Sequence, residues 1–351
     1  MAEALEYPVA SPPKPGEAIP LAGGVHWVRL PLPGALAHIN VWLIEDGAGF
    51  TLIDTGMDLP VVRAAWQGPL SQYLRGRKLA RIICTHHHPD HVGLAAWLAE
   101  VHGAPVYMSR AEARLLKEFA GPPDPARDVN WRVEAFARDG LASTEKLRST
   151  LAGENFRAVV SGVPKDLRPL EAGEELDIGG QRWVPLEAKG HTDGQLVFHA
   201  PALKLLISGD QVLPRITSNI GIYPERADLR PLASFLASFK ALAALDPEPT
   251  VLPSHGDVFV GLRARLEYLD THHRATLERV LTLIEGPVSA RELADRLFRS
   301  PLDSMNLVLA VGEALAHLEH LAGSGAVQVL EPPGGPRRYQ RTESQVPSRT
   351  A

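Results

Sequence analysis

Four candidate metal ligands stand within the six positions from His86 to His91. His86 and His88 are two positions apart, so in an extended turn their rings point to the same side, and Asp90 and His91 follow directly. The run lies inside the chain at the end of an apolar segment, where an expression tag does not occur. A cluster of this density at a strand end predicts a metal site.

Three residues of the same types follow predicted strand ends later in the chain. His191 stands in a Gly-His-Thr turn, Asp210 follows the apolar run Leu205–Gly209, and His255 lies in a Ser-His-Gly turn. Each of these alone is more often structural than functional, but loops at one edge of a sheet are where function concentrates. Together with the first run, they become candidate ligands.

The single cysteine, Cys84, excludes an internal disulfide and a thiolate metal cluster, so a metal site must use histidine and carboxylate. We expect Cys84 to be a buried core thiol and His87 to be a packing residue. Five imidazoles and two carboxylates suit Zn²⁺, and iron or manganese is also compatible with these ligand types.

The elements that must position these residues alternate between strands and helices. From Val25 the apolar residues recur with period two, which is typical of strands, and later segments switch to helical spacing. The predicted strands cover residues 39–44, 50–53, 79–85, 175–178, 181–185, 195–199 and 204–208, and the predicted helices cover 59–74 and 92–102. This order favours the α/β class, with sheets covered by helices.

Changes in composition suggest the domain boundaries. Five prolines predict an extended arm over residues 1–23 without assigned structure. The main domain is expected over 24–260, and a helical insert at about 110–168 is interpreted as a cover for the site. A C-terminal helical domain over 261–342 and a tail over 343–351 complete the chain.

The C-terminal domain has the outline of a winged helix, because predicted helices are followed by a predicted hairpin. The helices are expected over 259–284, 290–298 and 304–322, with a capping box at Ser289–Glu292, and the hairpin strands over 326–330 and 337–340. Residues 276–342 carry seven arginines and no lysine against eight acidic residues, so this segment is about neutral. Packing or homodimer formation is therefore favoured over nucleic-acid binding for this domain.

Composition sets outer limits on function. The chain has 351 residues, with 45% hydrophobic and 22% charged residues, which is typical of globular proteins. No apolar stretch is long enough to cross a bilayer, the N-terminus has no secretory pattern, and one unpaired cysteine fits the cytoplasm. A net charge of −5 gives no basic footprint, so nucleic acid is not favoured as a partner.

The order of the motifs resembles that of the metallo-β-lactamase-fold hydrolases. The resemblance covers residues 25–260 and rests on the H-x-H-x-D-H run, the three later motifs, and the early Asp54-Thr55-Gly56. It implies an αββα sandwich of two mixed sheets flanked by helices, with two metal ions at its edge. The C-terminal part is similar to the winged-helix branch that includes the β-lactamase-like protein 2 group and to glyoxalase II-like enzymes.

Carried over position by position, the resemblance also implies the ligands. One metal would be held by His86, His88 and His191, the other by Asp90, His91 and His255, with Asp210 as the bridge and Asp54 orienting the ligands from behind. A cysteine ligand and a glutamate at position 88 are both missing, which argues against an antibiotic-hydrolysing β-lactamase and against an oxygen-reducing flavodiiron protein.

A metal-bound hydroxide is the expected nucleophile, and Asp90 is the candidate catalytic residue that orients it and passes its proton to the leaving group. Arg215, Asn219 and Tyr223 are candidate substrate contacts. The favoured substrate is a small ester, thioester or lactone. The alternatives are a single-strand-specific ribonuclease and an iron-dependent persulfide dioxygenase.

Overall fold

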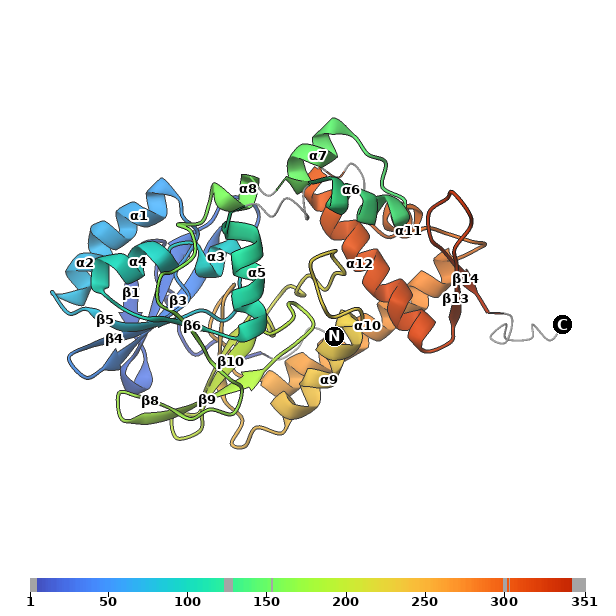
Figure 1. Cartoon of the computed structure of the whole chain (residues 1–351). Coiled ribbons are helices and arrows are strands. Elements are labelled where there is room, and N and C mark those ends of the chain that lie inside the picture. Colours follow the sequence, from blue (N-terminus) through green and yellow to red (C-terminus); the bar gives the residue numbers. More distant parts are fainter. Residues whose placement is uncertain (1–4, 123–128, 153, 299–301, 303, 343–351) are drawn as a thin grey trace. The chain divides into compact units, whose positions relative to one another are not determined.

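The computed structural model describes residues 5–122, 129–152, 154–298, 302 and 304–342 (Figure 1). By internal packing the chain divides into two units, each described here by itself. The first unit comprises Met1–Pro123, Asn155–Ser218 and Ser238–Glu267, and the second comprises Asp124–Glu154, Asn219–Ala237 and Tyr268–Ala351. The domain boundaries expected from the sequence stay predictions, and the tail 343–351 and first four residues of the arm lie outside the described residues.

The first unit contains a seven-stranded mixed sheet whose strands follow one another in chain order. The strands are β1 (Ala18–Pro20), β2 (Val25–Pro31), β3 (His38–Asp46), β4 (Gly49–Ile53), β5 (Leu79–Ile83), β6 (Val106–Met108) and β7 (Leu167–Pro169). Strands β1 to β4 pair antiparallel, while β4 to β7 pair parallel.

The arm is expected to be extended, without assigned structure, and the structure places β1 within it, paired with β2 at the edge of the sheet. Pro20 ends this strand. An edge position tolerates proline because the missing N–H group would otherwise face away from the sheet.

A second sheet of five strands has the order β12-β11-β10-β9-β8. These strands are β8 (Leu176–Ile178), β9 (Gln181–Glu187), β10 (Leu196–Ala200), β11 (Leu205–Gly209) and β12 (Thr250–Pro253). All neighbours pair antiparallel except β11 and β12, which are parallel. This sheet is therefore mixed as well.

Two apolar layers hold the first unit together. Trp27 and Trp42 face each other across β2 and β3, with ring centroids 6.1 Å apart, and share a buried cluster with Trp183 and Phe198 of the second sheet. The opposite face of the first sheet packs against helices, including the buried Trp66. The helices of this unit are α1 (Pro60–Gln67), α2 (Pro69–Leu74), α3 (Pro89–Val92), α4 (Ala95–His102), α5 (Arg110–Ala120) and α8 (Glu154–Arg157). Two mixed sheets with helices on the outside confirm the predicted fold class.

The single helix expected over 59–74 is wrong, because Gly68 separates α1 from α2. Gly68 precedes Pro69, and a residue before proline is disfavoured in the helical conformation. The helix expected over 92–102 starts later, at Ala95, because Gly93 and Leu94 separate α4 from the short helix α3, which ends at Val92.

The second unit is mainly helical and has its own apolar core. The remaining α-helices and strands of the described residues are α6 (Val129–Arg138), α7 (Glu145–Leu151), α9 (Pro231–Ala243), α10 (Leu262–Leu283), α11 (Ala290–Leu297), α12 (Ser304–Gly323), β13 (Val327–Leu330) and β14 (Arg338–Arg341). The capping box is confirmed, since Ser289 Oγ accepts from the backbone N–H of Glu292 and the Glu292 carboxylate accepts from the N–H of Ser289. Helices followed by the antiparallel β13–β14 pair match the expected element order, and the winged-helix class stays a prediction.

Within the described residues, no helix combines the length and the apolar composition that crossing a membrane requires.

Candidate metal centre

The first four candidate ligands lie where β5 gives way to α3. His88 has φ −60° and ψ 148°, the extended conformation favoured before a proline, and Pro89 opens the helix. His88 therefore lies on extended backbone just before the helix, His86 lies in the bend that follows β5, and Asp90 and His91 lie on the first helical turn. Gly93, at the end of α3, permits close packing against the loop after β4, because a Cβ atom there would lie only 2.7 Å from Gly56 O.

The other three candidates reach the same edge from the second sheet. Asp210 follows β11 and His255 follows β12, and because these strands are parallel, their carboxyl ends meet at one edge. His191 lies in the turn between β9 and β10. Gly256, with φ +85°, supports the turn after His255, where a Cβ atom would lie 2.6 Å from Pro214 Cγ.

One group of candidate ligands contains three histidines and an aspartate. His88 Nδ1 lies 3.0 Å from both His86 Nε2 and His191 Nε2, and His191 Nε2 lies 3.3 Å from Asp210 Oδ2. Ligand atoms about 2.0–2.1 Å from a tetrahedral metal are about 3.3 Å apart, so these four atoms have nearly the spacing that a bound cation requires.

The second group contains Asp90, His91 and His255. Asp90 Oδ2 lies 3.3 Å from His255 Nε2 and 3.6 Å from His91 Nε2. Asp210 Oδ1 lies 3.4 Å from His91 Nε2 and 3.5 Å from His255 Nε2. The two oxygens of Asp210 thus face the two groups, which is the geometry of a bridging carboxylate.

Two buried atoms in the cluster test whether a cation fits. In the described part of the chain, His91 Nε2 and Asp210 Oδ1 have no hydrogen-bond partner. Buried polar atoms rarely go without a partner, and a metal ion between them would satisfy both. The structure brings the seven predicted ligands together and their donor set fits two cations, while the ligand assignment itself stays a prediction.

Hydrogen bonds behind the ligands fix the orientation of the rings. Asp54 Oδ2 accepts from His91 Nδ1 at 2.8 Å, and Asp54 also accepts from the backbone N and the hydroxyl of Thr85 at 2.8 and 2.9 Å. His255 Nδ1 lies 2.9 Å from His38 O, and His86 Nδ1 lies 3.0 Å from Thr85 Oγ1. A proton on each Nδ1 leaves Nε2 free to bind a metal.

Burial and charge divide the cluster electrostatically. Burial and the neighbouring imidazoles hold the pKa values of His86 and His88 well below their ordinary value, which keeps both rings neutral, as metal ligation requires. Burial also lowers the pKa of His91, but the carboxylates of Asp90, Asp54 and Asp210 outweigh it and raise that pKa well above its ordinary value. The half of the cluster that contains the carboxylates therefore favours positive charge, which a divalent cation would supply.

The candidate substrate contacts lie in different places. Arg215 is exposed, and its guanidinium lies over the ring of Tyr7 at 5.7 Å. Asn219 and Tyr223 belong to the second unit, where the Tyr223 hydroxyl donates to Asn219 Oδ1 at 2.6 Å and Asn219 Nδ2 donates to Glu313 Oε2 at 3.2 Å. Their role in substrate binding stays a prediction.

Cys84 and His87 are both expected to be packing residues, and His87 also has a buried polar partner. Cys84 is fully buried, as expected of a core thiol. His87 does pack, against Phe119, but its Nδ1 also lies 2.6 Å from the buried carboxylate of Glu112. Sequence reasoning missed Glu112, since nothing in the pattern around it points to His87.

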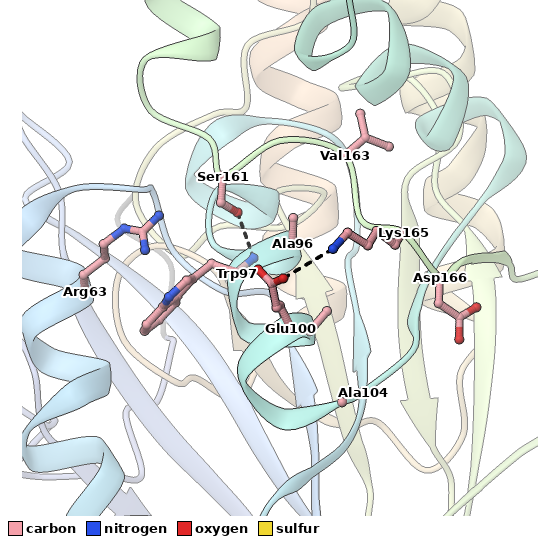
Figure 2. Close-up of a pocket in the computed structure, with 11 residues that line it drawn as sticks. Arg63, Ala96, Trp97, Glu100, Ala104, Ser161, Val163, Lys165 and Asp166 are labelled. Carbon is pink, nitrogen blue, oxygen red and sulfur yellow. Dashed lines mark hydrogen bonds and ion pairs between the residues drawn. The ribbon is translucent and has the colours of Figure 1, made fainter.

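A surface groove on the helical side of the first unit is separate from this cluster. It has a volume of about 520 Å³ and is lined by α4 and residues 161–166, with none of the seven candidate ligands among its lining (Figure 2). Some of its polar groups pair with one another: the backbone N–H of Trp97 donates to Ser161 Oγ at 3.1 Å, and Lys165 Nζ lies 3.3 Å from Glu100 Oε1 (Figure 2).

Comparisons with known proteins agree with this geometry. The metallo-beta-lactamase superfamily matches residues 35–255, and the C-terminal domain of metallo-beta-lactamase-like proteins matches residues 277–342. The chain is 28% identical to a probable metallo-hydrolase, YqjP, of Bacillus subtilis, over 86% of this chain and 92% of the relative. It is 25% identical to a hydroxyacylglutathione hydrolase of Fuscovulum blasticum, over 80% of this chain and 93% of the relative.

Two solved structures extend the similarity to the whole chain. A beta-lactamase domain protein from Burkholderia ambifaria is 35% identical and superposes with a TM-score of 0.87, covering 96% of this chain and 98% of the other. A metallo-beta-lactamase family protein from Thermus thermophilus is 31% identical, with a TM-score of 0.78, covering 91% and 99%. The chain therefore belongs to the metallo-beta-lactamase superfamily and is one of its metallohydrolases.

Proposed function

We propose that this metallohydrolase cleaves a small acyl thioester, within a wider class of small esters and lactones, using two divalent metal ions. The observation that carries the proposal is Asp210, whose two carboxylate oxygens face the two groups of candidate ligands. Similarity to hydroxyacylglutathione hydrolases, which act on a thioester, supports the choice among substrates.

A pair of divalent cations, when bound, lowers the pKa of a shared water and polarises the substrate carbonyl. His86, His88 and His191 would hold one cation, and Asp90, His91 and His255 the other. Asp90 is the proposed catalytic residue, since its carboxylate can orient the attacking water and pass the proton to the leaving sulfur. Asp54 and the carbonyl of His38 keep His91 and His255 in the orientation that ligation needs.

Zinc is the proposed metal, because neutral imidazoles and carboxylates are its common ligands, with iron or manganese as the competitors. We further propose a cytoplasmic location, a small-molecule substrate, and a packing or homodimer role for the C-terminal domain over 261–342. The near-neutral charge of that domain supports packing over nucleic-acid binding.

The test is a turnover assay on metal-loaded protein with a panel of substrates: hydroxyacyl-glutathione, acyl-coenzyme A thioesters, a lactone and labelled single-stranded RNA. We expect hydrolysis of at least one thioester and none of the RNA. Cleavage of RNA without thioester hydrolysis would refute the proposal. Iron as the bound metal, together with oxygen consumption on a persulfide substrate, would instead favour a dioxygenase.

A further inference from the structure

A fully buried carboxylate lies behind the three-histidine group. Glu112 stands in the first turn of α5 and has no exposed surface. Its Oε2 accepts from the backbone N–H of His87 at 3.0 Å and lies 2.6 Å from His87 Nδ1, while its Oε1 accepts from the backbone N–H of Gly194 at 2.7 Å. One side chain thus binds two backbone segments that are far apart in the sequence.

These two segments supply the histidines of one candidate metal site. His87 stands between His86 and His88, and Gly194 belongs to the turn that carries His191. The first segment comes from the first sheet and the second from the second sheet. The positions of the three rings relative to one another therefore depend on what joins these segments, and Glu112 joins them directly.

The turn is fitted closely against the start of α5. A Cβ atom at Gly194 would lie 2.7 Å from both Ser109 Oγ and Ala111 Cβ, so only glycine allows this approach. On the other side, the ring of His87 stacks on Phe119 of the same helix, with centroids 5.6 Å apart and planes 5° from parallel. The start of α5, the loop around His87 and the turn at Gly194 therefore pack together around the Glu112 carboxylate.

A helix-capping role does not explain Glu112. Ser109 and Glu112 have the S-x-x-E spacing of a capping box, and Ser109 Oγ accepts from the Glu112 N–H at 3.2 Å. At the same spacing in α11, the Glu292 carboxylate accepts from the backbone N–H of Ser289 at 2.9 Å, which completes the capping box. Glu112 directs its carboxylate to the two loops instead.

We propose that Glu112 is a positioning residue for the metal centre, which sets the spacing of His86, His88 and His191 by tying their two loops together. The inference rests on the metal ions of the proposed function, and not on the identity of the substrate. A buried carboxylate is costly unless its oxygens are hydrogen-bonded, so these bonds are expected to persist in the native state.

Two variants test the proposal in different ways. Glu112→Gln keeps the length of the side chain but replaces one acceptor oxygen by an NH₂ group, which must then face either the Gly194 N–H or the His87 N–H. Glu112→Asp keeps both acceptors and the charge, but is one methylene too short to reach both loops. Glu100→Gln is the control, because it removes the same charge from the surface of α4, where the partner is Lys165 and neither ligand-bearing loop is involved.

The measurement is zinc content by mass spectrometry after equilibration with graded chelator, together with thermal unfolding of the metal-free proteins. We expect both Glu112 variants to lose one zinc equivalent at chelator concentrations about 10–100-fold lower than the wild type does, with the second equivalent unchanged. Glu100→Gln should release zinc as the wild type does.

Wild-type zinc retention in both Glu112 variants would overturn the proposal. So would a failure of both variants to fold without metal, since Glu112 would then support the fold as a whole. Zinc retention does not depend on turnover, so a protein that binds two zinc ions and hydrolyses no thioester refutes the proposed function and leaves this inference standing.

Discussion

Asp54 offers the sharpest test of how the second group of ligands is held. Its backbone has φ +60°, a left-handed conformation that asparagine adopts far more readily than alanine. Asp54→Asn therefore changes the charge and one acceptor while keeping the backbone and the shape. Asp54→Ala removes the side chain and adds backbone strain of about 1–2 kcal/mol.

The magnitude follows from the bonds that Asp54 makes. Its Oδ2 is 2.8 Å from His91 Nδ1, and its Oδ1 accepts from the Thr85 N–H. In Asp54→Asn, the amide can accept from only one of these two groups. A hydrogen bond to a charged group contributes about 1.5–3 kcal/mol, and about 1.4 kcal/mol corresponds to a tenfold change in affinity. We expect the metal at Asp90, His91 and His255 to bind about 10–100-fold more weakly.

Chelator titration of the purified variants measures this loss, and unfolding of the metal-free proteins separates it from stability. We expect Asp54→Asn to weaken one metal equivalent with little change in metal-free stability, and Asp54→Ala to lose both affinity and stability. Unchanged affinity in Asp54→Asn would show that Asp54 does not orient His91. A weakened three-histidine site with an intact second site would contradict the assignment of His91 to that second site.

Three further predictions concern other parts of the molecule. His88→Ala should weaken metal binding by more than about 100-fold, because the loss of a ligand costs more than the 10–100-fold loss expected for a residue that only hydrogen-bonds to a ligand. The circular dichroism spectrum should stay that of the wild type. Full metal content in this variant would refute His88 as a ligand. Burial, with smaller contributions from His317 and His272, lowers the pKa of His273 to about 3. Because its unfolded-state pKa is about 6.5, stability should be retained above pH 6.5 and fall by up to about 1.4 kcal/mol per unit below it. Denaturant unfolding at pH 7, 6 and 5 should show a shallower decline for His273→Phe, and equal slopes would contradict this. Ser289→Ala should destabilise the protein by about 1 kcal/mol through loss of the capping box, and an unchanged unfolding midpoint would count against that role.

The candidate ligands could be predicted from the sequence where they stand close together in the chain or directly after a predicted strand. His86, His88, Asp90 and His91 stand within one short run, and Asp210 and His255 follow strand ends, so pattern and topology together bring them to one edge. The capping box of α11 was equally visible, because both partners are three residues apart.

Glu112 could not be predicted in the same way. Its spacing from Ser109 is that of Glu292 from Ser289, yet the two glutamates bind different partners. The difference comes from tertiary structure, since the turn at Gly194 packs onto one helix start and offers its N–H group there. The sequence around Glu112 does not show that a distant turn packs against the start of this helix.

The break at Gly68 and the edge strand β1 show the limits of periodicity for secondary structure. Apolar spacing continued through Gly68, but the steric effect of Pro69 ended the helix. Prolines argued against a helix or a central strand in the arm, and they could not show that residues 18–20 pair with the edge of the sheet.

The division of the candidate ligands between two sheets has a mechanical consequence. His86 and His88 follow the first sheet while His191 and Asp210 belong to the second, so each bound cation would act as a removable cross-link between the two halves of the sandwich. Like any ligand that binds only the folded state, it would stabilise the protein in proportion to the logarithm of the free metal concentration. Supply of metal in the cell would then govern how long the enzyme persists, as well as how fast it works.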